Sequence, residues 1–180
     1  MSQNKAVKAF IGMGSNLGDG RTILQAAWQA LGNVNGIVPD GLSSPYITAP
    51  VDMTSPHWFT NAVGRVQVSL PPLELLKVLL AVEASFGRTR NEEIAGYQDR
   101  GLDLDLLFYG NVVMESPELI LPHPHLGDRL FVLVPFAELE PDFRNNLSDT
   151  TIAEKELCLR DAMAASRNKE QEIIRGSWRE

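Results

Sequence analysis

Two aspartates, Asp103 and Asp105, stand one residue apart in a segment where aspartate alternates with leucine. This alternation is typical of a β-strand, in which neighbouring side chains point to opposite faces. The two carboxylates would therefore share a face, with α-carbons roughly 6.6 Å apart. Carboxylates this close repel each other, and burial makes their ionised forms more costly. A raised pKa, an arginine partner or a metal ion would relieve that cost.

The surroundings of the aspartates separate two interpretations, a magnesium site and the exposed acidic side of an edge strand. The opposite face of the strand would carry four apolar side chains, Leu102, Leu104, Leu106 and Phe108. We expect Leu107 and Tyr109 to add apolar bulk on the acidic face, which places the aspartates beside a packed region and favours the metal site. Three arginines precede the strand, Arg88, Arg90 and Arg100, and guanidinium groups pair well with carboxylates and phosphates.

Length and composition limit what the chain can do. Its 180 residues are 44% hydrophobic and 22% charged, which predicts one globular domain with a sizeable core. The net charge of -7 argues against a nucleic-acid binder, so an anionic ligand would need a local arginine cluster.

Cys158 is the only cysteine, which excludes an intrachain disulfide and a thiolate zinc site. The longest apolar run near the N-terminus, residues 9–13, is too short for a membrane span or signal core. We therefore expect a cytoplasmic protein.

The hydrophobic pattern predicts the elements that position these residues. We predict strands over residues 6–13, 42–48, 59–70 and 102–109, and helices over residues 22–31 and 73–86. This order predicts an α+β fold, a ferredoxin-like βαββαβ sheet with helices on its faces and extra short C-terminal helices. The strand at residues 6–13 ends in a glycine-rich turn that lacks both GxGxxG and GK[ST], so we interpret it as a strand-to-helix turn rather than a phosphate loop.

The remaining segments are expected to be connections and short elements. Turn residues at 34–41 predict a loop, and residues 111–114 could pair with the acidic strand. Residues 131–139 predict two helical turns broken at Pro135. The charged segment from residue 151 to residue 180 predicts a partly detached helical tail, to which we assign no chemistry.

Several short motifs follow one another in a specific order. They are GSNLG from Gly14, SSPYIT from Ser43, FTNA from Phe59, Glu83 followed by FGRTR from Phe86, RGLDLD from Arg100, and LPHP from Leu121 followed by Arg129 and Phe131. Each motif alone is a weak signal, but together, in this order and at these spacings, they resemble the 6-hydroxymethyl-7,8-dihydropterin pyrophosphokinase family. The resemblance covers about residues 1–145, which would form the pterin pyrophosphokinase domain, and leaves residues 146–180 as the tail.

The resemblance implies transfer of a diphosphate from ATP to the hydroxymethyl group of a reduced pterin, giving AMP and the pterin diphosphate in folate biosynthesis. It implies that Asp103 and Asp105 hold two Mg²⁺ ions and that Arg88 and Arg100 balance charge on the moving phosphates. The residues on the nucleotide side would be Glu83, Arg90, Leu106, His123 and Arg129. The residues lining the pterin pocket would be Thr48, Ala49, Val51, Phe59, Asn61 and Phe131. The partners would be these small molecules, with no nucleic acid and no membrane, and the protein would be a monomer.

The sequence departs from the family pattern mainly at residues 91–99, which are longer than usual and lack a Gly-Pro. We expect this segment to be a loop that is mobile without ligand and closes over the nucleotide. Ala49 replaces a common proline, and Leu80 replaces a glutamine. Two alternatives therefore stay open: a diverged paralogue that binds or modifies a related pterin, and a non-catalytic ferredoxin-like module that binds a nucleotide or metal.

Overall fold

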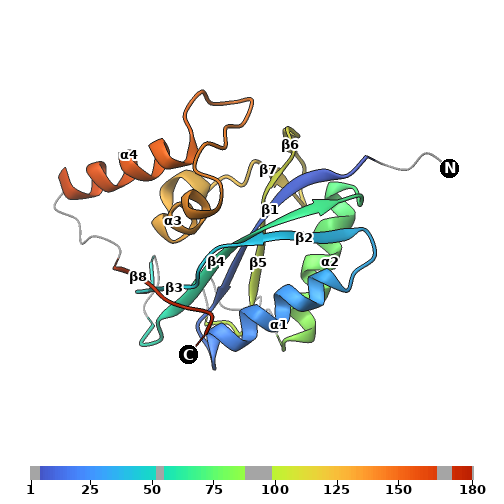
Figure 1. Ribbon diagram of the computed structural model, residues 1–180, viewed down its shortest axis with the longest axis horizontal. Coiled ribbons are helices and arrows are strands. Elements are labelled where there is room, and N and C mark those ends of the chain that lie inside the picture. The colour runs from blue at the N-terminus through green and yellow to red at the C-terminus, as the bar shows by residue number, and fades with distance from the viewer. Residues whose placement is uncertain (1–4, 52–54, 88–98, 166–171, 180) are drawn as a thin grey trace.

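The computed structural model describes residues 5–51, 55–87, 99–165 and 172–179, and it has the predicted mixed α+β architecture (Figure 1). The first half of the chain contains β1 (Val7–Ser15), α1 (Gly20–Gly32), β2 (Ile37–Leu42), β3 (Tyr46–Thr48), β4 (Phe59–Val68) and α2 (Pro72–Ser85). The second half contains β5 (Asp103–Tyr109), β6 (Met114–Glu115), β7 (Ile120–Leu121), the 3₁₀ turn η1 (Leu126–Asp128), α3 (Leu130–Leu139), α4 (Ile152–Ala165) and β8 (Ile173–Arg175).

The main sheet is antiparallel, with the strand order β5-β1-β4-β3-β8, and β2 pairs with β4 beside β3. Apart from β8, this is the ferredoxin-like arrangement, because β1 and β4 lie side by side in the middle. Helices α1 and α2 cover one face of the sheet, and α3 with α4 lie over the other (Figure 1). None of the helices in the described ranges is both long and apolar enough to cross a membrane.

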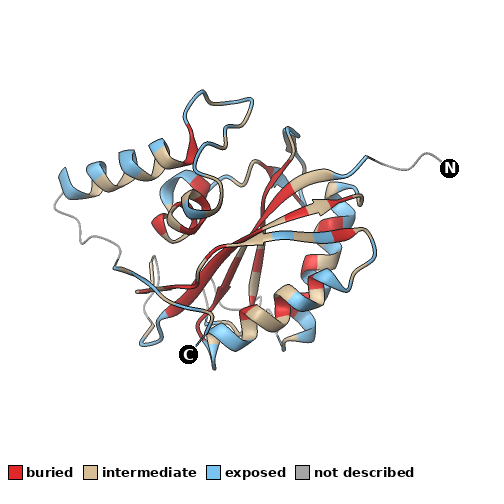
Figure 2. Ribbon diagram, viewed as in Figure 1, coloured by how far each residue is buried: buried red, intermediate tan, exposed pale blue. Residues whose placement is uncertain are grey.

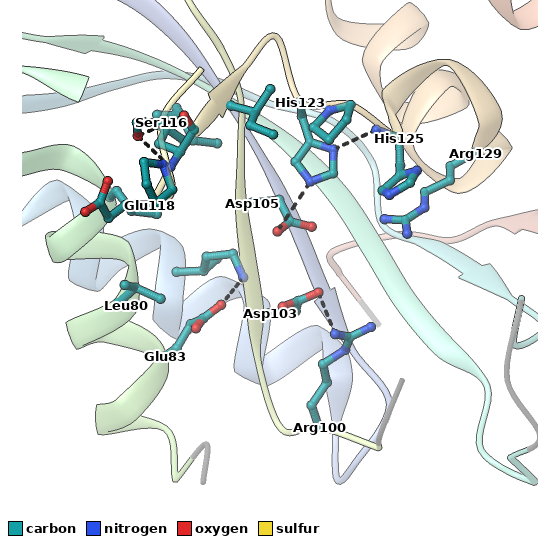
Figure 3. Close-up of a pocket in the computed structure, with 17 residues that line it drawn as sticks. Leu80, Glu83, Arg100, Asp103, Asp105, Ser116, Glu118, His123, His125 and Arg129 are labelled. Carbon is teal, nitrogen blue, oxygen red and sulfur yellow. Dashed lines mark hydrogen bonds and ion pairs between the residues drawn. The ribbon is translucent and has the colours of Figure 1, made fainter. Parts of the chain in front are cut away.

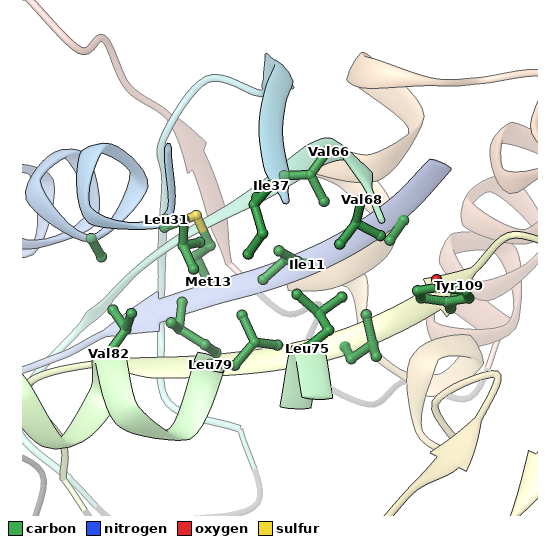
Figure 4. Packing of buried hydrophobic residues seen from close by; sticks show 14 of the residues in the cluster. Ile11, Met13, Leu31, Ile37, Val66, Val68, Leu75, Leu79, Val82 and Tyr109 are labelled. Atoms are coloured by element: carbon green, nitrogen blue, oxygen red, sulfur yellow. The ribbon is translucent and has the colours of Figure 1, made fainter. Parts of the chain in front are cut away.

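Each face of the sheet has its own hydrophobic core. On the α1 and α2 side, Ile11, Leu75 and Leu79 belong to one buried cluster (Figure 4). On the α3 side, Phe10 and Phe136 belong to a second cluster, with ring centroids 4.5 Å apart. Burial of one such side chain stabilises the fold by about 1.5–3 kcal/mol. The central strands β1, β4 and β5 are accordingly buried along most of their length, while the outer helix surfaces are exposed (Figure 2).

A β-bulge in β5 changes the face predicted for its last residues. Phe10 pairs with Phe108 whereas Ile11 pairs with Leu106, so Leu107 is the additional residue. As a result Leu107 and Phe108 both lie in the α3-side core, and Tyr109 lies in the α2-side core. The prediction that Phe108 shares a face with the leucines is therefore wrong, as is the placement of Tyr109 on the acidic face.

Four further sequence predictions are wrong. The supposed loop at residues 34–41 contains most of β2, because Pro39 lies at an irregularity in the pairing with β4 and so interrupts the ladder only locally. The predicted strand at 42–48 is consequently reduced to β3. Helix α3 is continuous through Pro135 rather than two broken turns. In addition, β6 pairs with β7 and not with β5.

The tail is attached to the domain in both of its described parts. Ile152, at the start of α4, is 1% exposed and belongs to the α3-side core. Strand β8 pairs with β3 and extends the main sheet by one strand. The expected helix is present as α4, but the expectation that the tail is partly detached is wrong for these residues. The contacts that attach the tail come from a three-residue strand and a few apolar side chains, which the sequence pattern does not reveal.

Candidate active site

Asp103 and Asp105 open β5 and lie on the α3 side of the sheet, opposite the buried Leu104 and Leu106. This confirms the shared face that the alternation predicts. Both aspartates line a cleft of ≈ 380 Å³ (Figure 3). The cleft is also lined by five residues predicted for the phosphate and nucleotide side, namely Glu83, Arg100, Leu106, His123 and Arg129. Arg88, Arg90 and the segment 91–98 lie outside the described residues.

The two predicted ligand sites meet across β1. Gly14 of β1 pairs with Asn61 of β4 on one side and with Asp103 of β5 on the other. A β-carbon at Gly14 would lie 3.0 Å from Asn61 Oδ1 and 3.9 Å from the Asp103 β-carbon. The glycine therefore leaves the space between the amide and the carboxylate clear of side-chain atoms.

The ionisable groups of the cleft are coupled. Arg100 Nη1 lies 3.1 Å from Asp103 Oδ2, and His123 Nε2 lies 4.0 Å from Asp105 Oδ1 (Figure 3). The Asp105 side chain is 41% exposed, but its carboxylate is largely enclosed by the protein. This enclosure is the main cause, and the nearby charge of Asp103 the second cause, that raises the pKa of Asp105 to about 6. A cation bound between these carboxylates would favour their ionised forms.

His123 is neutral at pH 7. Its burial, followed by the positive charge of Arg129, lowers the pKa of His123 to about 4. The Nδ1 atom accepts a hydrogen bond of 3.3 Å from the backbone N–H of His125. In the neutral ring Nε2 then carries the proton, and this N–H is on the side of Asp105. His123 can therefore donate a hydrogen bond into the cleft.

Glu83 holds the acidic strand in place. Its side chain is 2% exposed, and Oε1 accepts a hydrogen bond of 2.7 Å from the backbone N–H of Leu104. Leu104 stands between the two aspartates, so this contact fixes β5 against α2 at the point where both carboxylates emerge. The bond gives Glu83 a positioning role at the cleft.

The donor set fits magnesium. Among the residues that the structure describes, no group of three or more His, Cys, Asp or Glu side chains could hold a metal ion. Mg²⁺ usually binds through one or two carboxylates together with waters and substrate phosphates rather than in an all-protein cage. Asp103 and Asp105 could supply that pair of oxygen ligands, and a triphosphate would have to supply others.

The six residues predicted for the pterin line one pocket of ≈ 30 Å³: Thr48, Ala49, Val51, Phe59, Asn61 and Phe131. Asn61 Nδ2 donates a hydrogen bond of 2.8 Å to Thr48 Oγ1, which sets the direction of the amide. The pocket has about the volume of one water molecule, so a bicyclic ring could enter only if lining side chains shift.

An arginine from the cleft covers each aromatic ring of this pocket. The Arg100 guanidinium lies 5.8 Å from the centroid of Phe59, and that of Arg129 lies 5.6 Å from the centroid of Phe131. Both distances fall within the range of a cation–π contact. The pocket and the cleft therefore share two cationic side chains.

Asn16 belongs to the GSNLG motif and is expected from the sequence to lie in a turn, and the structure places it at the entrance to β5. Asn16 Oδ1 accepts a hydrogen bond of 2.7 Å from the backbone N–H of Arg100, and Asn16 Nδ2 donates one of 2.6 Å to Asp99 Oδ1. Hydrogen bonds from Ser55 and Asn16 hold the pKa of Asp99 below its ordinary value. Sequence analysis also missed several lining residues of the cleft, including Ser116, Glu118, Ile120 and His125. An asparagine at a strand end fits any turn, so no local signal predicts the contact of Asn16 with Arg100.

Comparisons with known proteins show the family of the chain. Residues 10–141 match the family model of 7,8-dihydro-6-hydroxymethylpterin-pyrophosphokinase (HPPK). A Synechocystis protein named 2-amino-4-hydroxy-6-hydroxymethyldihydropteridine pyrophosphokinase is 42% identical over 144 residues, which cover 80% of this chain and 72% of that protein. A Methylorubrum extorquens protein of the same name is 38% identical over 135 residues, covering 75% of this chain and 84% of its own.

The fold is also found in solved structures. The wild-type Plasmodium falciparum HPPK-DHPS chain, crystallised with SDX-DHP, superposes with a TM-score of 0.74 at 13% identity, over 97% of this chain. The chain spans about half of that solved chain, 48% of its length. With the family model matched over most of the sequence, the chain belongs to the 7,8-dihydro-6-hydroxymethylpterin-pyrophosphokinase family.

Proposed function

We propose that the cleft binds ATP with magnesium and the adjacent pocket binds a reduced pterin, so that the two substrates meet at Arg100. The observation that carries this proposal is the position of the Arg100 guanidinium, which contacts Asp103 at 3.1 Å and covers the Phe59 ring at 5.8 Å. One cation thus joins the phosphate side to the pterin side.

Family membership gives the overall reaction. The enzyme is an ATP-dependent diphosphotransferase of folate biosynthesis. The hydroxymethyl oxygen of 6-hydroxymethyl-7,8-dihydropterin attacks the β-phosphorus of ATP, and a new O–P bond forms as the hydroxyl proton leaves. The bond between the β-phosphorus and the bridging oxygen of the α-phosphate breaks, which releases AMP and leaves the pterin diphosphate. Such a transfer depends mainly on positioning and on neutralisation of phosphate charge.

Asp103 and Asp105 would hold two Mg²⁺ ions on their shared face. When bound, the metal would offset the negative charge of the phosphates. Arg100 and Arg129 line the same cleft and suit bidentate contacts with phosphate. Neutral His123 would donate from Nε2 to a phosphate oxygen. Arg88 and Arg90 are proposed for the same phosphates on the basis of sequence alone.

The pterin would be held by stacking and by one oriented amide. Phe59 and Phe131 would enclose the ring system, and rings supply area while a fixed polar group supplies orientation. Because Asn61 Nδ2 donates to Thr48, Oδ1 is the atom that would accept from a pterin N–H. Backbone groups of Ala49 and Val51 would complete the wall.

We further propose that residues 1–145 form the catalytic domain, with residues 146–180 as an appended segment, and that the enzyme works as a cytoplasmic monomer without nucleic-acid or membrane partners. The family match over residues 10–141 supports the division. Size-exclusion chromatography with light scattering tests the oligomeric state, and a dimer mass would contradict it.

Pterin-dependent formation of AMP tests the proposed function. Incubation with ATP, Mg²⁺ and 6-hydroxymethyl-7,8-dihydropterin should yield AMP, and omission of the pterin should abolish it. ADP instead of AMP would indicate transfer of a single phosphate. No consumption of ATP, with either ligand still bound, would favour the non-catalytic module, and turnover of only a different pterin would favour the diverged paralogue.

A further inference from the structure

Strand β8 lies against the strand that forms one wall of the pterin pocket. Its register pairs Arg175 with Tyr46, Ile174 with Ile47 and Ile173 with Thr48. Beyond the strand ends, the N–H of Ala49 donates to Glu172 O at 3.3 Å, and the N–H of Gly176 donates to Pro45 O at 2.7 Å. These bonds continue the ladder on both sides, so β8 covers the whole of β3.

Side chains fix β8 to the rest of the domain. Arg175 Nη2 lies 2.8 Å from Glu138 Oε1 on α3, and Glu138 Oε2 accepts from the Tyr46 hydroxyl at 2.7 Å. Trp178 Nε1 donates to Ser43 O at 2.7 Å, just before β3 begins. These side-chain contacts lie at the start of β3 and include α3, and at the end of β3 the backbone hydrogen bond from Ala49 to Glu172 holds β8 in the same register.

The strand held in this way ends in pocket residues. Thr48 and Ala49 line the pterin pocket, and Thr48 Oγ1 receives the hydrogen bond that orients the Asn61 amide. Strand β3 is only three residues long. Without β8 it would be an exposed edge with unpaired backbone groups on one side. A displacement of β3 would move Thr48, and with it the amide.

We propose that β8 is a positioning element of the pterin pocket, which holds β3 in the register that places Thr48 and Ala49 and so orients Asn61. The inference rests on the proposed function and extends it to a segment that follows the residues matched by the family model. Its consequence is that affinity for the pterin depends on residues 172–178, whereas affinity for the nucleotide, which lies on the β5 side of the sheet, does not.

The test uses Ile174→Pro in the full chain, with Ile174→Ala as the matched control. The backbone hydrogen bonds between Ala49 and Glu172 and between Gly176 and Pro45 lie two residues to either side of Ile174 and Ile47. In an antiparallel ladder this spacing makes Ile174 and Ile47 a hydrogen-bonded pair. Proline fits an extended chain but removes the N–H. The Ile174 side chain is 51% exposed, so both variants lose similar packing and only Ile174→Pro loses the ladder bond.

The dissociation constants of 6-hydroxymethyl-7,8-dihydropterin and of α,β-methylene-ATP with Mg²⁺ are measured for each protein by calorimetry. We expect Ile174→Pro to weaken pterin binding about three- to tenfold, the effect of roughly one hydrogen bond, with nucleotide binding within about twofold of wild type. Ile174→Ala should resemble wild type for both ligands. Amide hydrogen exchange across residues 46–49 should accelerate in Ile174→Pro only.

A second pair of variants tests the inference if Ile174→Pro does not fold. Arg175→Ala removes the contact with Glu138, and Arg179→Ala removes a nearby exposed arginine as the control. Selective loss of pterin affinity in Arg175→Ala alone supports the inference. Unchanged pterin affinity in the folded β8 variants, or an equal loss for both ligands, overturns it while the proposed function stands. Absence of pterin binding in the wild-type protein would overturn both.

Discussion

Asn16 and Arg100 are joined by two hydrogen bonds that run in opposite directions. The backbone N–H of Asn16 donates to Arg100 O at 3.1 Å, and Arg100 N–H donates to Asn16 Oδ1 at 2.7 Å. The strand-to-helix turn after β1 therefore fixes the backbone from which the Arg100 side chain reaches Asp103 and Phe59.

Loss of the Asn16 side chain should impair catalysis more than stability. In Asn16→Ala the Arg100 N–H loses its acceptor, and the guanidinium shifts relative to the phosphates. We expect kcat/KM to fall about tenfold to a hundredfold, the effect of small misplacements at a reacting centre. Steady-state AMP formation measures this, and Asn111→Ala in the exposed turn after β5 is the control. Wild-type kinetics in Asn16→Ala would show that Arg100 needs no such support.

Neutralisation of either carboxylate should abolish turnover while the protein remains folded. Asp103→Asn and Asp105→Asn keep side-chain size but remove the anionic oxygen ligands, and we expect activity to fall by at least about a hundredfold at saturating Mg²⁺. Asp142→Asn, an exposed change, is the control.

Asp105→Asn should have a second effect, on stability. The pKa of Asp105 in the folded protein is about 6, above its ordinary value of 3.8. Its contribution to stability is therefore present at low pH and is lost as pH rises through about 6. In metal-free buffer at pH 7 the asparagine variant should melt no lower than wild type. A markedly lower melting temperature would contradict the assigned cost of the enclosed Asp105 charge.

Gly14→Ala should weaken pterin binding. The new β-carbon would stand 3.0 Å from Asn61 Oδ1, so the amide must move, and overpacking of this kind costs about 1–3 kcal/mol. We expect the pterin dissociation constant to rise at least about fivefold. Gly127→Ala is the matched control, because nothing lies within 4 Å of its added carbon. Equal affinities for the two variants would show that the Asn61 amide tolerates a side chain at position 14 without loss of pterin binding.

Glu138 should make stability depend on pH through its contacts with β3 and β8. Burial alone would raise its pKa, but hydrogen bonds from Tyr46, Ser44 and Arg175 hold the pKa of Glu138 below its ordinary value of 4.5. Because the folded-state pKa is lowered, the stabilisation is present above pH 4.5 and is lost as pH falls through the folded-state pKa.

The test of Glu138 compares urea unfolding of Glu138→Gln and wild type. We expect a loss of about 1 kcal/mol at pH 7 that shrinks towards pH 3. Glu74→Gln, whose side chain is 54% exposed in a pair with Lys77, should change stability by less than about 0.5 kcal/mol. A loss for Glu138→Gln that is the same at both pH values would contradict the role of its charge.

The sequence predicted those parts of the site that depend on local pattern. Alternation placed Asp103 and Asp105 on one face. The family resemblance, carried by the ordered motifs, implied six pterin residues that line one pocket in the structure. The bulge at Leu107 was not predictable, since two apolar residues in succession fit either face. Strand β8 and the contact of Asn16 with Arg100 depend on partners distant in the chain, so no periodicity signals them.

The position of the β-phosphorus after the reaction shows whether the enzyme transfers a diphosphate from ATP to the pterin. ATP radiolabelled at the β-phosphorus is incubated with Mg²⁺, 6-hydroxymethyl-7,8-dihydropterin and the enzyme, and the products are separated by chromatography. We expect the label to move to the pterin diphosphate, in an amount equal to the unlabelled AMP, and we expect Asp103→Asn to abolish this transfer. Label that remains in ADP, or in unconsumed ATP, would contradict diphosphate transfer.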